Sequence, residues 1–352
     1  MKFWAGFCVE GLSPKENDIK YVNVRGNPFR IHGIYNLSDD NFRRLPTDFA
    51  NTVSGGVATH AKSSAGVRVR FATDSPYIAI KATLKDFVPS PYVAYIASKG
   101  FDLYTEEDGE FIYHNTFLPP LDSDNEVVGI TKFAVKKVRN IVIDFPIDTE
   151  VSELFVGIKD GSKLLNPDEY KIKKPILFYG SSITQGFAAS RPGNIYENFI
   201  SRAINADYYN FGFSGSALGE ESLAEYLSKI PMSAFVVDYD YNAPDVEHLK
   251  KTHKRFYEKI RENNPRLPII MVSRPDCRNS DNQVECRKII KRTYQIAKAN
   301  GDNNVYFING ATLFPKSVSL DCTVDGTHPN DLGMAGIAKG IGKVLNDILS
   351  YC

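Results

Sequence analysis

Near its midpoint the chain reads Pro175-Ile176-Leu177-Phe178-Tyr179-Gly180-Ser181-Ser182-Ile183-Thr184-Gln185-Gly186. A short apolar run that ends in a glycine and a polar turn predicts a buried strand that delivers a serine to the edge of a sheet. In parallel α/β sheets, ligands bind at this carboxyl edge. A serine there can act as a nucleophile if other segments supply a base, an orienting acid and oxyanion donors.

The composition limits the class of protein. At 352 residues the chain exceeds the usual size of one core, so we expect two domains. Its 42 basic and 42 acidic residues balance, and this favours neither nucleic acid nor an anionic membrane as a partner. No apolar run approaches the length of a membrane span.

The chain start and the cysteines bear on localisation. The segment from Met1 to Glu10 lacks a sustained apolar region, so we expect no signal peptide. The five cysteines are sparse and lack CxxC spacing, which favours reduced thiols over disulfides or a zinc site (Cys8, Cys277, Cys286, Cys322 and Cys352). We therefore expect a cytoplasmic protein, with export from a longer precursor as the alternative.

Residues 1–170 form the first expected domain, and about residues 20–165 of it show the period-two pattern of β-strands. Val67, Val69 and Phe71 alternate with Arg68 and Arg70. Turn signals such as Glu107-Asp108-Gly109 separate several such runs. Many short strands with little helical periodicity predict an antiparallel β-sandwich.

The pattern changes after Lys171–Pro175, and residues 174–352 alternate between strands and helices. This alternation predicts an α/β domain with a parallel sheet covered on both faces. The apolar runs lie at residues 176–179, 234–237, 269–272 and 305–308, and the clearest helices at 195–204, 222–228, 246–262, 285–300 and 332–349.

A catalytic base would have to be one of six histidines. His248 and His253 lie in a charged helix and are expected to face solvent. His328 lies in a loop just before the last helix, and Asp325 precedes it by three residues. A carboxylate at this spacing could fix the imidazole tautomer and favour the imidazolium formed during attack. The alternative is a capped surface loop.

Oxyanion donors are available at two further strand ends. Asn210-Phe211-Gly212-Phe213-Ser214-Gly215 offers the backbone N–H of Gly215. Asn242 follows the next apolar run and offers a side-chain amide. Glycine and asparagine are also ordinary turn residues, so each signal is weak alone. The order of Ser, Gly, Asn and Asp-x-x-His at successive strand ends is stronger evidence for a catalytic site than any one of these signals.

In this order the segments resemble the SGNH hydrolase family, also called GDSL-type esterases. Gly180 to Gly186 is similar to the first family block, Asn210 to Gly215 to the second, Asn242 to the third and Asp325 to Pro329 to the last. The resemblance covers roughly residues 174–350 and implies a flavodoxin-like, three-layer α/β/α hydrolase domain. Between the adjacent serines, the spacing to Gly180 and Gly186 favours Ser182.

The resemblance also implies roles. Ser182 would be the nucleophile and the first oxyanion donor, with Gly215 and Asn242 completing the oxyanion hole. His328 would be the base and Asp325 would orient it, with no metal or organic cofactor.

The sequence departs from the family pattern at three positions. Ser181 and Ala243 stand where the family usually has Asp, and Asp240 stands where it usually has Gly.

Residues Gly100-Phe101-Asp102-Leu103-Tyr104 match the Gly-x-Asp-Leu-Tyr signature of a β-sandwich that precedes some SGNH domains. The aromatic side chains in and near this signature could stack on a sugar, but we favour sandwich core (Phe101, Tyr104, Phe111 and Tyr113). Arg274 follows another strand, and either a pocket-lining or a salt-bridge role is open for it.

These observations predict a two-domain serine esterase. Its expected partner is a small-molecule or carbohydrate ester carrying a short acyl group, particularly acetyl, and neither nucleic acid nor a membrane. One alternative is an acyltransferase that uses the same acyl-enzyme, and another is a non-catalytic carbohydrate-binding protein on the same scaffold. The sequence does not predict the oligomeric state.

Overall fold

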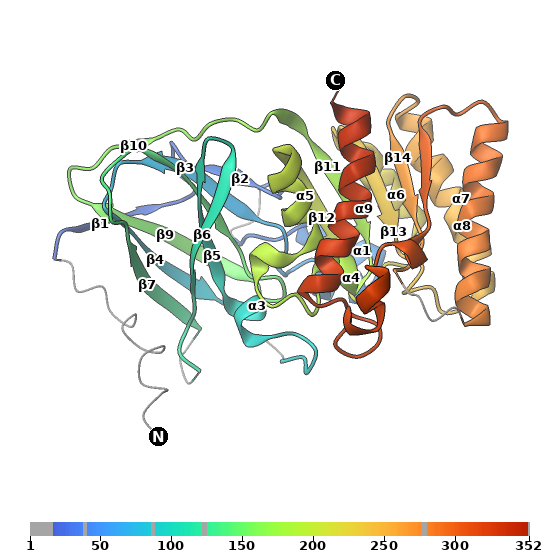
Figure 1. Ribbon diagram of the computed structural model, residues 1–352, viewed down its shortest axis with the longest axis horizontal. Coiled ribbons are helices and arrows are strands. Elements are labelled where there is room, and N and C mark those ends of the chain that lie inside the picture. Colours follow the sequence, from blue (N-terminus) through green and yellow to red (C-terminus); the bar gives the residue numbers. More distant parts are fainter. Residues whose placement is uncertain (1–16, 38–40, 86–88, 122–124, 276–279, 351–352) are drawn as a thin grey trace.

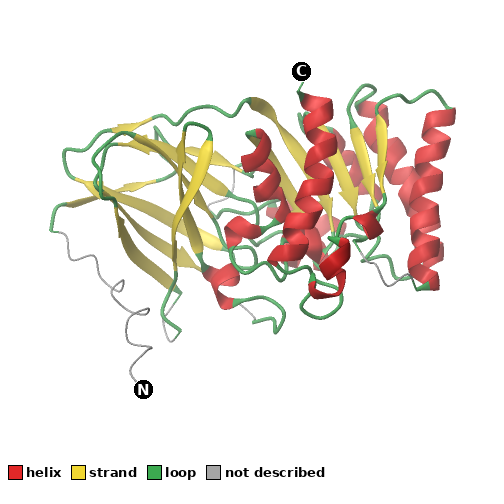
Figure 2. Cartoon of the chain, in the orientation of Figure 1, coloured by secondary structure: helices red, strands yellow, loops and turns green. Residues whose placement is uncertain are grey.

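A computed structural model describes residues 17–37, 41–85, 89–121, 125–275 and 280–350. The chain start from Met1 to Glu10 and three of the cysteines considered above (Cys8, Cys277 and Cys352) lie outside these ranges. A β-rich half occupies one end of the molecule and a mixed α/β half the other (Figures 1 and 2).

The first half consists of antiparallel strands. They are β1 (Ile19–Asn23), β2 (Arg30–His32), β3 (Arg68–Thr73), β4 (Tyr77–Leu84), β5 (Phe101–Glu107), β6 (Glu110–Phe117), β7 (Glu126–Lys132), β8 (Arg139–Asp144), β9 (Val151–Lys159) and β10 (Leu164–Leu165). Within the described ranges one sheet has the order β1-β9-β4-β7. The other has the order β10-β3-β8-β5-β6, with β2 also paired to β3.

The two sheets share one hydrophobic core. Val69 and Phe71 of β3 belong to the same buried cluster as Ile78 and Ile80 of β4. The predicted antiparallel sandwich is therefore confirmed.

The arginines that alternate with this core are buried as well. Arg68 and Arg70 are 1% and 0% exposed, and Arg68 Nη2 lies 2.5 Å from Asp207 Oδ1 in the α/β half. At Arg68 the outer face of β3 is thus covered by the second half of the chain, whereas Arg70 pairs with Glu106 of β5.

The second half is built on the parallel sheet β12-β11-β13-β14-β15. Its strands are β11 (Ile172–Gly180), β12 (Ala206–Gly212), β13 (Ala234–Asp238), β14 (Ile269–Val272) and β15 (Val305–Ile308). Its helices are α4 (Ser182–Gln185), α5 (Tyr196–Ile204), α6 (Glu221–Ser228), α7 (Val246–Asn263), α8 (Asp281–Ala299) and α9 (Asp331–Leu349), with short 3₁₀ turns η1 (Pro192–Asn194), η2 (Gly310–Thr312) and η3 (Lys316–Asp321).

Alternate residues of β11 pack on opposite faces of this sheet. Leu177 and Tyr179 share a core with residues of α6, α7 and α8. Ile176 and Phe178 share another core with residues of α5 and α9. Helices therefore cover both faces (Figure 2), and the predicted three-layer α/β/α arrangement is confirmed.

The first half also contains short helices that the sequence pattern did not indicate. They are α1 (Thr47–Val53), α2 (Gly55–His60) and α3 (Tyr95–Lys99). Ala50 of α1 and Val57 of α2 lie in the core shared with α6, α7 and α8. A division of the chain at residue 170 therefore leaves the sandwich core whole but divides the core against α6, α7 and α8. None of the helices in the described ranges is long and apolar enough to cross a membrane.

Candidate active site

The predicted nucleophile lies at the turn from β11 into α4. Ser181 precedes the helix, and its Oγ accepts a hydrogen bond from the Ile183 N–H at 3.2 Å. Ser181 therefore caps the helix, as serine commonly does. Gly186 ends α4 with a φ of 107°, a left-handed conformation that favours glycine. Ser182 begins the helix and is 7% exposed.

A close approach explains the glycine before these serines. Gly180 pairs with Gly212 of β12 and with Asp238 of β13. A Cβ at Gly180 would lie 1.7 Å from Asp238 Oδ1 and 2.1 Å from Thr184 Oγ1. The hydroxyl of Thr184 donates to Asp238, which ties α4 to the sheet. Burial raises the pKa of the Asp238 carboxyl to about 8.

The structure brings Ser182, His328 and Asp325 together. His328 Nε2 lies 2.9 Å from Ser182 Oγ, and His328 Nδ1 lies 2.7 Å from Asp325 Oδ2. Because an ionised carboxylate only accepts hydrogen bonds, it favours a proton on Nδ1 and leaves Nε2 to accept from the serine. The three side chains are thus hydrogen-bonded in the order that acid–base activation of a serine requires.

The loop that carries His328 is fixed by local hydrogen bonds. Asp325 Oδ1 accepts from the backbone N–H groups of Thr327 at 2.9 Å and His328 at 2.8 Å. Burial raises the pKa of the Asp325 carboxyl, but the hydrogen bonds from His328 and Thr327 outweigh it and lower the pKa below its ordinary value. The aspartate therefore stays ionised near neutral pH.

The two remaining predicted site residues lie on neighbouring segments. Gly215 follows β12 with a φ of 63°. Asn242 follows β13, and its Nδ2 donates to Phe213 O at 2.9 Å, while the Phe213 N–H donates to Gly180 O at 2.9 Å. In the described part of the chain, no hydrogen bond joins Gly215 or Asn242 to Ser182. Their role as oxyanion donors stays a prediction.

An ion pair accounts for the unusual Asp240. Its side chain is fully buried, and Arg274 Nε lies 3.4 Å from its Oδ2. Arg274 Nη2 also donates to the backbone oxygen of Asp240 at 2.5 Å. Arg274 is therefore a salt-bridge partner that holds the segment leading to Asn242.

Two aromatic rings beside His328 were missed by sequence analysis. The rings of Tyr92 and Phe187 both lie 5.9 Å from the imidazole, at interplanar angles of 24° and 41°. Phe187 comes from the segment after α4 and Tyr92 from the sandwich half. The prolines at 89 and 91 mark a loop around Tyr92, but no local pattern indicates that this loop reaches the site.

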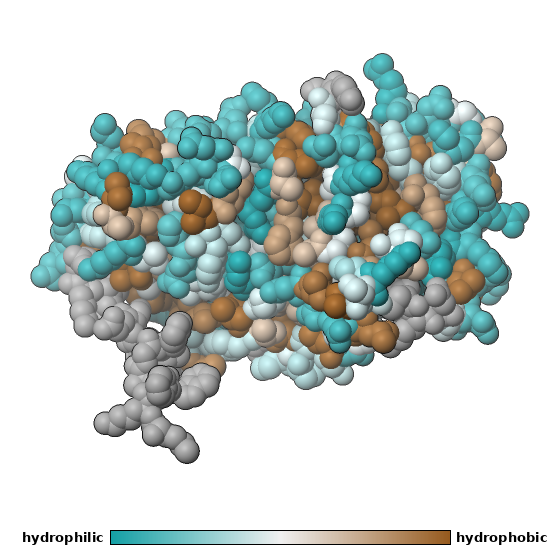
Figure 3. Space-filling view, in the orientation of Figure 1, coloured by the Kyte–Doolittle hydropathy of each residue, from teal (hydrophilic) through white to brown (hydrophobic). Residues whose placement is uncertain are grey.

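The loop around His328 also has an apolar rim. Figure 3 shows hydrophobic surface beside the loop that leads into α9, where Leu320, Val324 and Leu332 are exposed.

The expectation that His253 faces solvent is wrong. His253 is 3% exposed, its Nδ1 lies 3.1 Å from Thr293 Oγ1, and burial lowers its pKa to about 4. The reason is its spacing on α7, where it falls on the same stripe as the buried Leu249, Phe256 and Ile260. His253 is therefore a core histidine.

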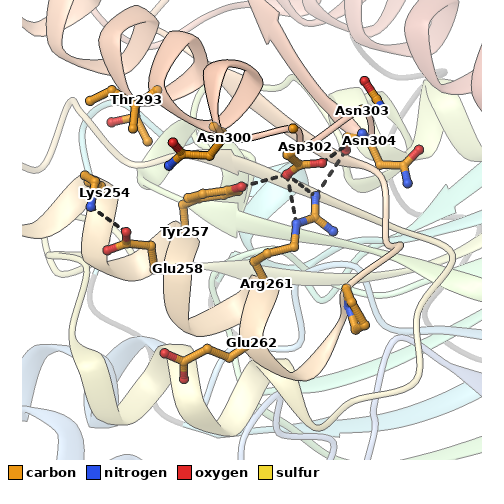
Figure 4. A pocket seen from close by; sticks show the side chains of 14 residues that line it. Lys254, Tyr257, Glu258, Arg261, Glu262, Thr293, Asn300, Asp302, Asn303 and Asn304 are labelled. Atoms are coloured by element: carbon orange, nitrogen blue, oxygen red, sulfur yellow. Dashed lines mark hydrogen bonds and ion pairs between the residues drawn. The ribbon is translucent and has the colours of Figure 1, made fainter.

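A pocket of about 650 Å³ lies elsewhere, between the carboxyl-terminal ends of α7 and α8 and the segment that enters β15 (Figure 4). There Asp302 accepts hydrogen bonds from Tyr257 Oη at 2.6 Å and Arg261 Nε at 2.9 Å. Tyr257, Arg261 and Asp302 are therefore hydrogen-bonded to one another. The pocket is at the amino end of β15, the opposite sheet edge from Ser182, so it is separate from the candidate site.

No group of three or more His, Cys, Asp or Glu side chains among the described residues is placed to hold a metal ion. The expectation of a cofactor-independent site stays a prediction.

A serine, a histidine and an aspartate linked at the carboxyl edge of a parallel sheet form the arrangement of a serine hydrolase. Comparison with known families agrees. Residues 173–346 match the GDSL-like lipase/acylhydrolase family, and residues 19–164 match the GxDLY N-terminal domain of SGNH-type esterases. The chain belongs to the SGNH, or GDSL-type, hydrolases and carries a GxDLY N-terminal domain.

Solved structures share this fold. One, described as a GDSL-like lipase from Bacteroides ovatus, is 26% identical with a TM-score of 0.86, over 94% of this chain and 98% of that one. A salicylyl-acyltransferase from a tetracycline biosynthetic pathway is 19% identical with a TM-score of 0.78, over 95% and 99%. An acetyl xylan esterase from Butyrivibrio proteoclasticus is 16% identical with a TM-score of 0.58, over 95% and 99%. No curated protein matched the sequence.

Proposed function

We propose that the protein is a serine esterase that removes short acyl groups, in particular acetyl, from carbohydrates. The observation that carries this proposal is the hydrogen-bonded series from Ser182 Oγ through the His328 ring to Asp325. It supplies a nucleophile, a base and an orienting carboxylate in one place.

The reaction begins when Ser182 Oγ attacks the ester carbonyl carbon. As the new C–O bond forms, His328 Nε2 takes the hydroxyl proton and the carbonyl electrons move onto the oxygen. Asp325 holds the Nδ1 proton and stabilises the resulting imidazolium. Collapse of the tetrahedral intermediate breaks the bond to the alcohol, which takes the proton from His328. Water then hydrolyses the acyl-enzyme by the same steps.

The oxyanion would be held by three donors. The Ser182 N–H belongs to the first turn of α4, where backbone N–H groups have no partner within the helix. Gly215 would add its N–H. Asn242 would add the second proton of its amide, because the first is donated to Phe213 O. No step requires a metal or an organic cofactor.

Two observations support a carbohydrate ester as the substrate. Solved structures with this fold include the acetyl xylan esterase and a family two carbohydrate esterase bound to cellohexaose. In addition, Tyr92 is 48% exposed beside His328, and it offers an aromatic face to a bound ring.

The test compares hydrolysis of p-nitrophenyl acetate, and then of acetylated sugars and longer-chain esters, by the wild type and Ser182→Ala. We expect hydrolysis by the wild type, a preference for acetylated sugars, and loss of activity in the variant. The matched control is Ser181→Ala, which removes the neighbouring hydroxyl and its helix cap but keeps the nucleophile. Comparable rates for wild type and Ser182→Ala would contradict the proposal.

Acyl transfer to a hydroxyl acceptor is the second candidate function. It would use the same acyl-enzyme, and the likeness to the salicylyl-acyltransferase favours it. Product analysis with and without an added sugar acceptor separates the two, because a transferase forms the acylated acceptor at the expense of free acid. A non-catalytic carbohydrate-binding protein would neither turn over esters nor be labelled at Ser182 by a fluorophosphonate probe.

A further inference from the structure

The polar side chains of the Gly-x-Asp-Leu-Tyr signature contact the α/β half. Asp102 lies on β5 with its side chain fully buried. Its Oδ2 accepts hydrogen bonds from Arg191 Nη1 at 2.5 Å and from the Gly193 N–H at 2.8 Å. The same Arg191 nitrogen donates to the Tyr104 hydroxyl. The signature therefore binds a loop that is far from it in sequence.

No free space remains between the Gly193 backbone and the side chains of Asp102 and Tyr104. A Cβ added to Gly193 would lie 2.3 Å from Tyr104 Oη and 2.7 Å from Asp102 Oδ2. Arg202 of α5 fixes the other side of the turn, since its Nη2 donates to Gly193 O at 2.7 Å. The backbone at Gly193 is thus held directly against the two signature side chains.

The same loop contacts the first residue of α9. The N–H and the Oγ of Ser190 donate to the two carboxylate oxygens of Asp331 at 2.8 and 2.6 Å. Asn194 Nδ2 donates to Asp331 Oδ2 at 2.8 Å. Asp331 follows His328 by three residues, so these bonds restrain the segment that carries the histidine.

At its other end the loop continues directly from the nucleophile helix. The Phe187 N–H donates to Ser182 O at 2.9 Å, and Gly186 donates to the same oxygen at 3.0 Å. Residues 186–194, which we call the docking loop, are therefore bound to the Ser182 helix, to the start of α9 and to the sandwich.

We propose that Asp102 and Tyr104 are positioning residues, which hold the docking loop so that Ser182 and His328 stay within hydrogen-bond distance. The sandwich thereby helps to set the distance between Ser182 and His328, although it contacts neither residue through Asp102 or Tyr104. This role rests on the proposed function, because it concerns the same serine and histidine. Small displacements of reacting groups lower the rate of the chemical step strongly, even when substrate binding is unchanged.

The test compares Asp102→Asn with a matched control, Asp207→Asn. Asp207 is also a mostly buried carboxylate paired with an arginine of the other half, since Arg68 Nη2 lies 2.5 Å from its Oδ1. It lies at the start of β12, and among the described residues no hydrogen bond or ion pair joins it to the docking loop. Asp207 Oδ2 also lies 2.8 Å from His32 Nδ1. Each substitution thus removes a carboxylate that pairs with an arginine of the other half, but only Asp102 contacts the docking loop.

We expect Asp102→Asn to lower kcat by about 10- to 100-fold with KM within about twofold of wild type. We also expect faster amide hydrogen exchange in residues 186–194 and 323–333, a readout that does not depend on catalysis. Asp207→Asn should change the amide exchange rate of neither segment. Its kcat should stay within about threefold of wild type. Equal effects of the two variants on kcat and on exchange would overturn the proposal.

A second variant covers the case in which Asp102→Asn does not fold. Ser190 is exposed, so Ser190→Ala removes its hydroxyl bond to Asp331 without disturbing a core. We expect a lower kcat with unchanged KM and faster exchange in residues 323–333. Wild-type kcat and exchange would contradict the proposal. The proposed function would instead be refuted if the wild type were inactive or if its activity survived Ser182→Ala. In that case the amide exchange measurement would still test whether Asp102 holds the docking loop.

Discussion

Tyr92 of the sandwich half stacks beside His328 of the α/β half, with ring centroids 5.9 Å apart and an interplanar angle of 24°. The tyrosine is 48% exposed, so one part of its ring faces the candidate base and another part remains accessible. A residue of the first half therefore forms part of the wall of a site whose reacting groups all come from the second half. Under the proposed function, we expect Tyr92 to contact the alcohol part of a bound ester.

Tyr92→Ala is expected to weaken substrate binding more than chemistry. Loss of one aromatic contact is worth about 1 kcal/mol, which corresponds to roughly a fivefold fall in kcat/KM, carried mainly by KM. Steady-state kinetics with an acetylated sugar measures kcat and KM separately. Tyr35→Ala is the control, because Tyr35 is also exposed and contacts a ring of the α/β half, Tyr209, at 6.2 Å. Equal kinetics for the two variants would exclude Tyr92 from the binding site.

Asp325→Asn is expected to abolish most of the activity. An amide can present its NH₂ to His328 Nδ1, and this stabilises the wrong tautomer and leaves no unprotonated Nε2 to accept from Ser182. We expect kcat to fall by about 10³- to 10⁴-fold with little change in stability. Asp321→Asn, an exposed carboxylate just before the same loop, should retain activity. A loss of less than tenfold in Asp325→Asn would remove Asp325 from the triad.

The parts of the fold and site that depend on local pattern could be predicted from sequence. β14 and β15 have the bounds of the apolar runs, because a buried parallel strand is a continuous apolar run. The turn from β11 into α4 and the Asp-x-x-His loop were also predictable. In both, hydrogen bonds between residues two or three apart fix the conformation.

The parts that depend on contact between the halves could not be predicted. Arg68 reads as an outward-facing residue of a strand, yet it is buried because the α/β half supplies Asp207 opposite to it. α1 and α2 form where they pack into a core built from distant helices. Tyr92 gives no signal of its own, because its role comes from where the chain places its loop.

Arg274→Ala is expected to destabilise the fold. Burial raises the pKa of the Asp240 carboxyl, and Arg274 partly offsets this, so removing the arginine leaves a buried acid without its counter-charge. Breaking such a pair costs about 3 kcal/mol, measurable as a lower free energy of unfolding in denaturant. The exposed Lys250–Glu247 pair is the control, and Lys250→Ala should cost less than about 1 kcal/mol. Equal costs would mean that the buried pair is not stabilising.

Asp238→Asn is expected to change how stability depends on pH. The Asp238 carboxyl is buried and accepts hydrogen bonds from Thr184 and Tyr196, and its pKa in the folded protein is about 8. In the unfolded chain an aspartate has a pKa of about 3.9. Between these values the folded state binds a proton that the unfolded state does not. The free energy of unfolding therefore falls as pH rises, by up to about 1.4 kcal/mol per pH unit from this group.

The cost of ionising Asp238 is thus absent below the unfolded pKa and complete above about pH 8. Asparagine carries no titrating proton, so Asp238→Asn should lose less stability than the wild type between pH 5 and pH 8. Asp148, whose pKa burial raises to about 7, titrates in both proteins and cancels in the difference. Asp160→Asn, an exposed carboxylate, should follow the wild type. Parallel stability curves for wild type and Asp238→Asn would show that the carboxyl beneath the nucleophile helix is already ionised at neutral pH.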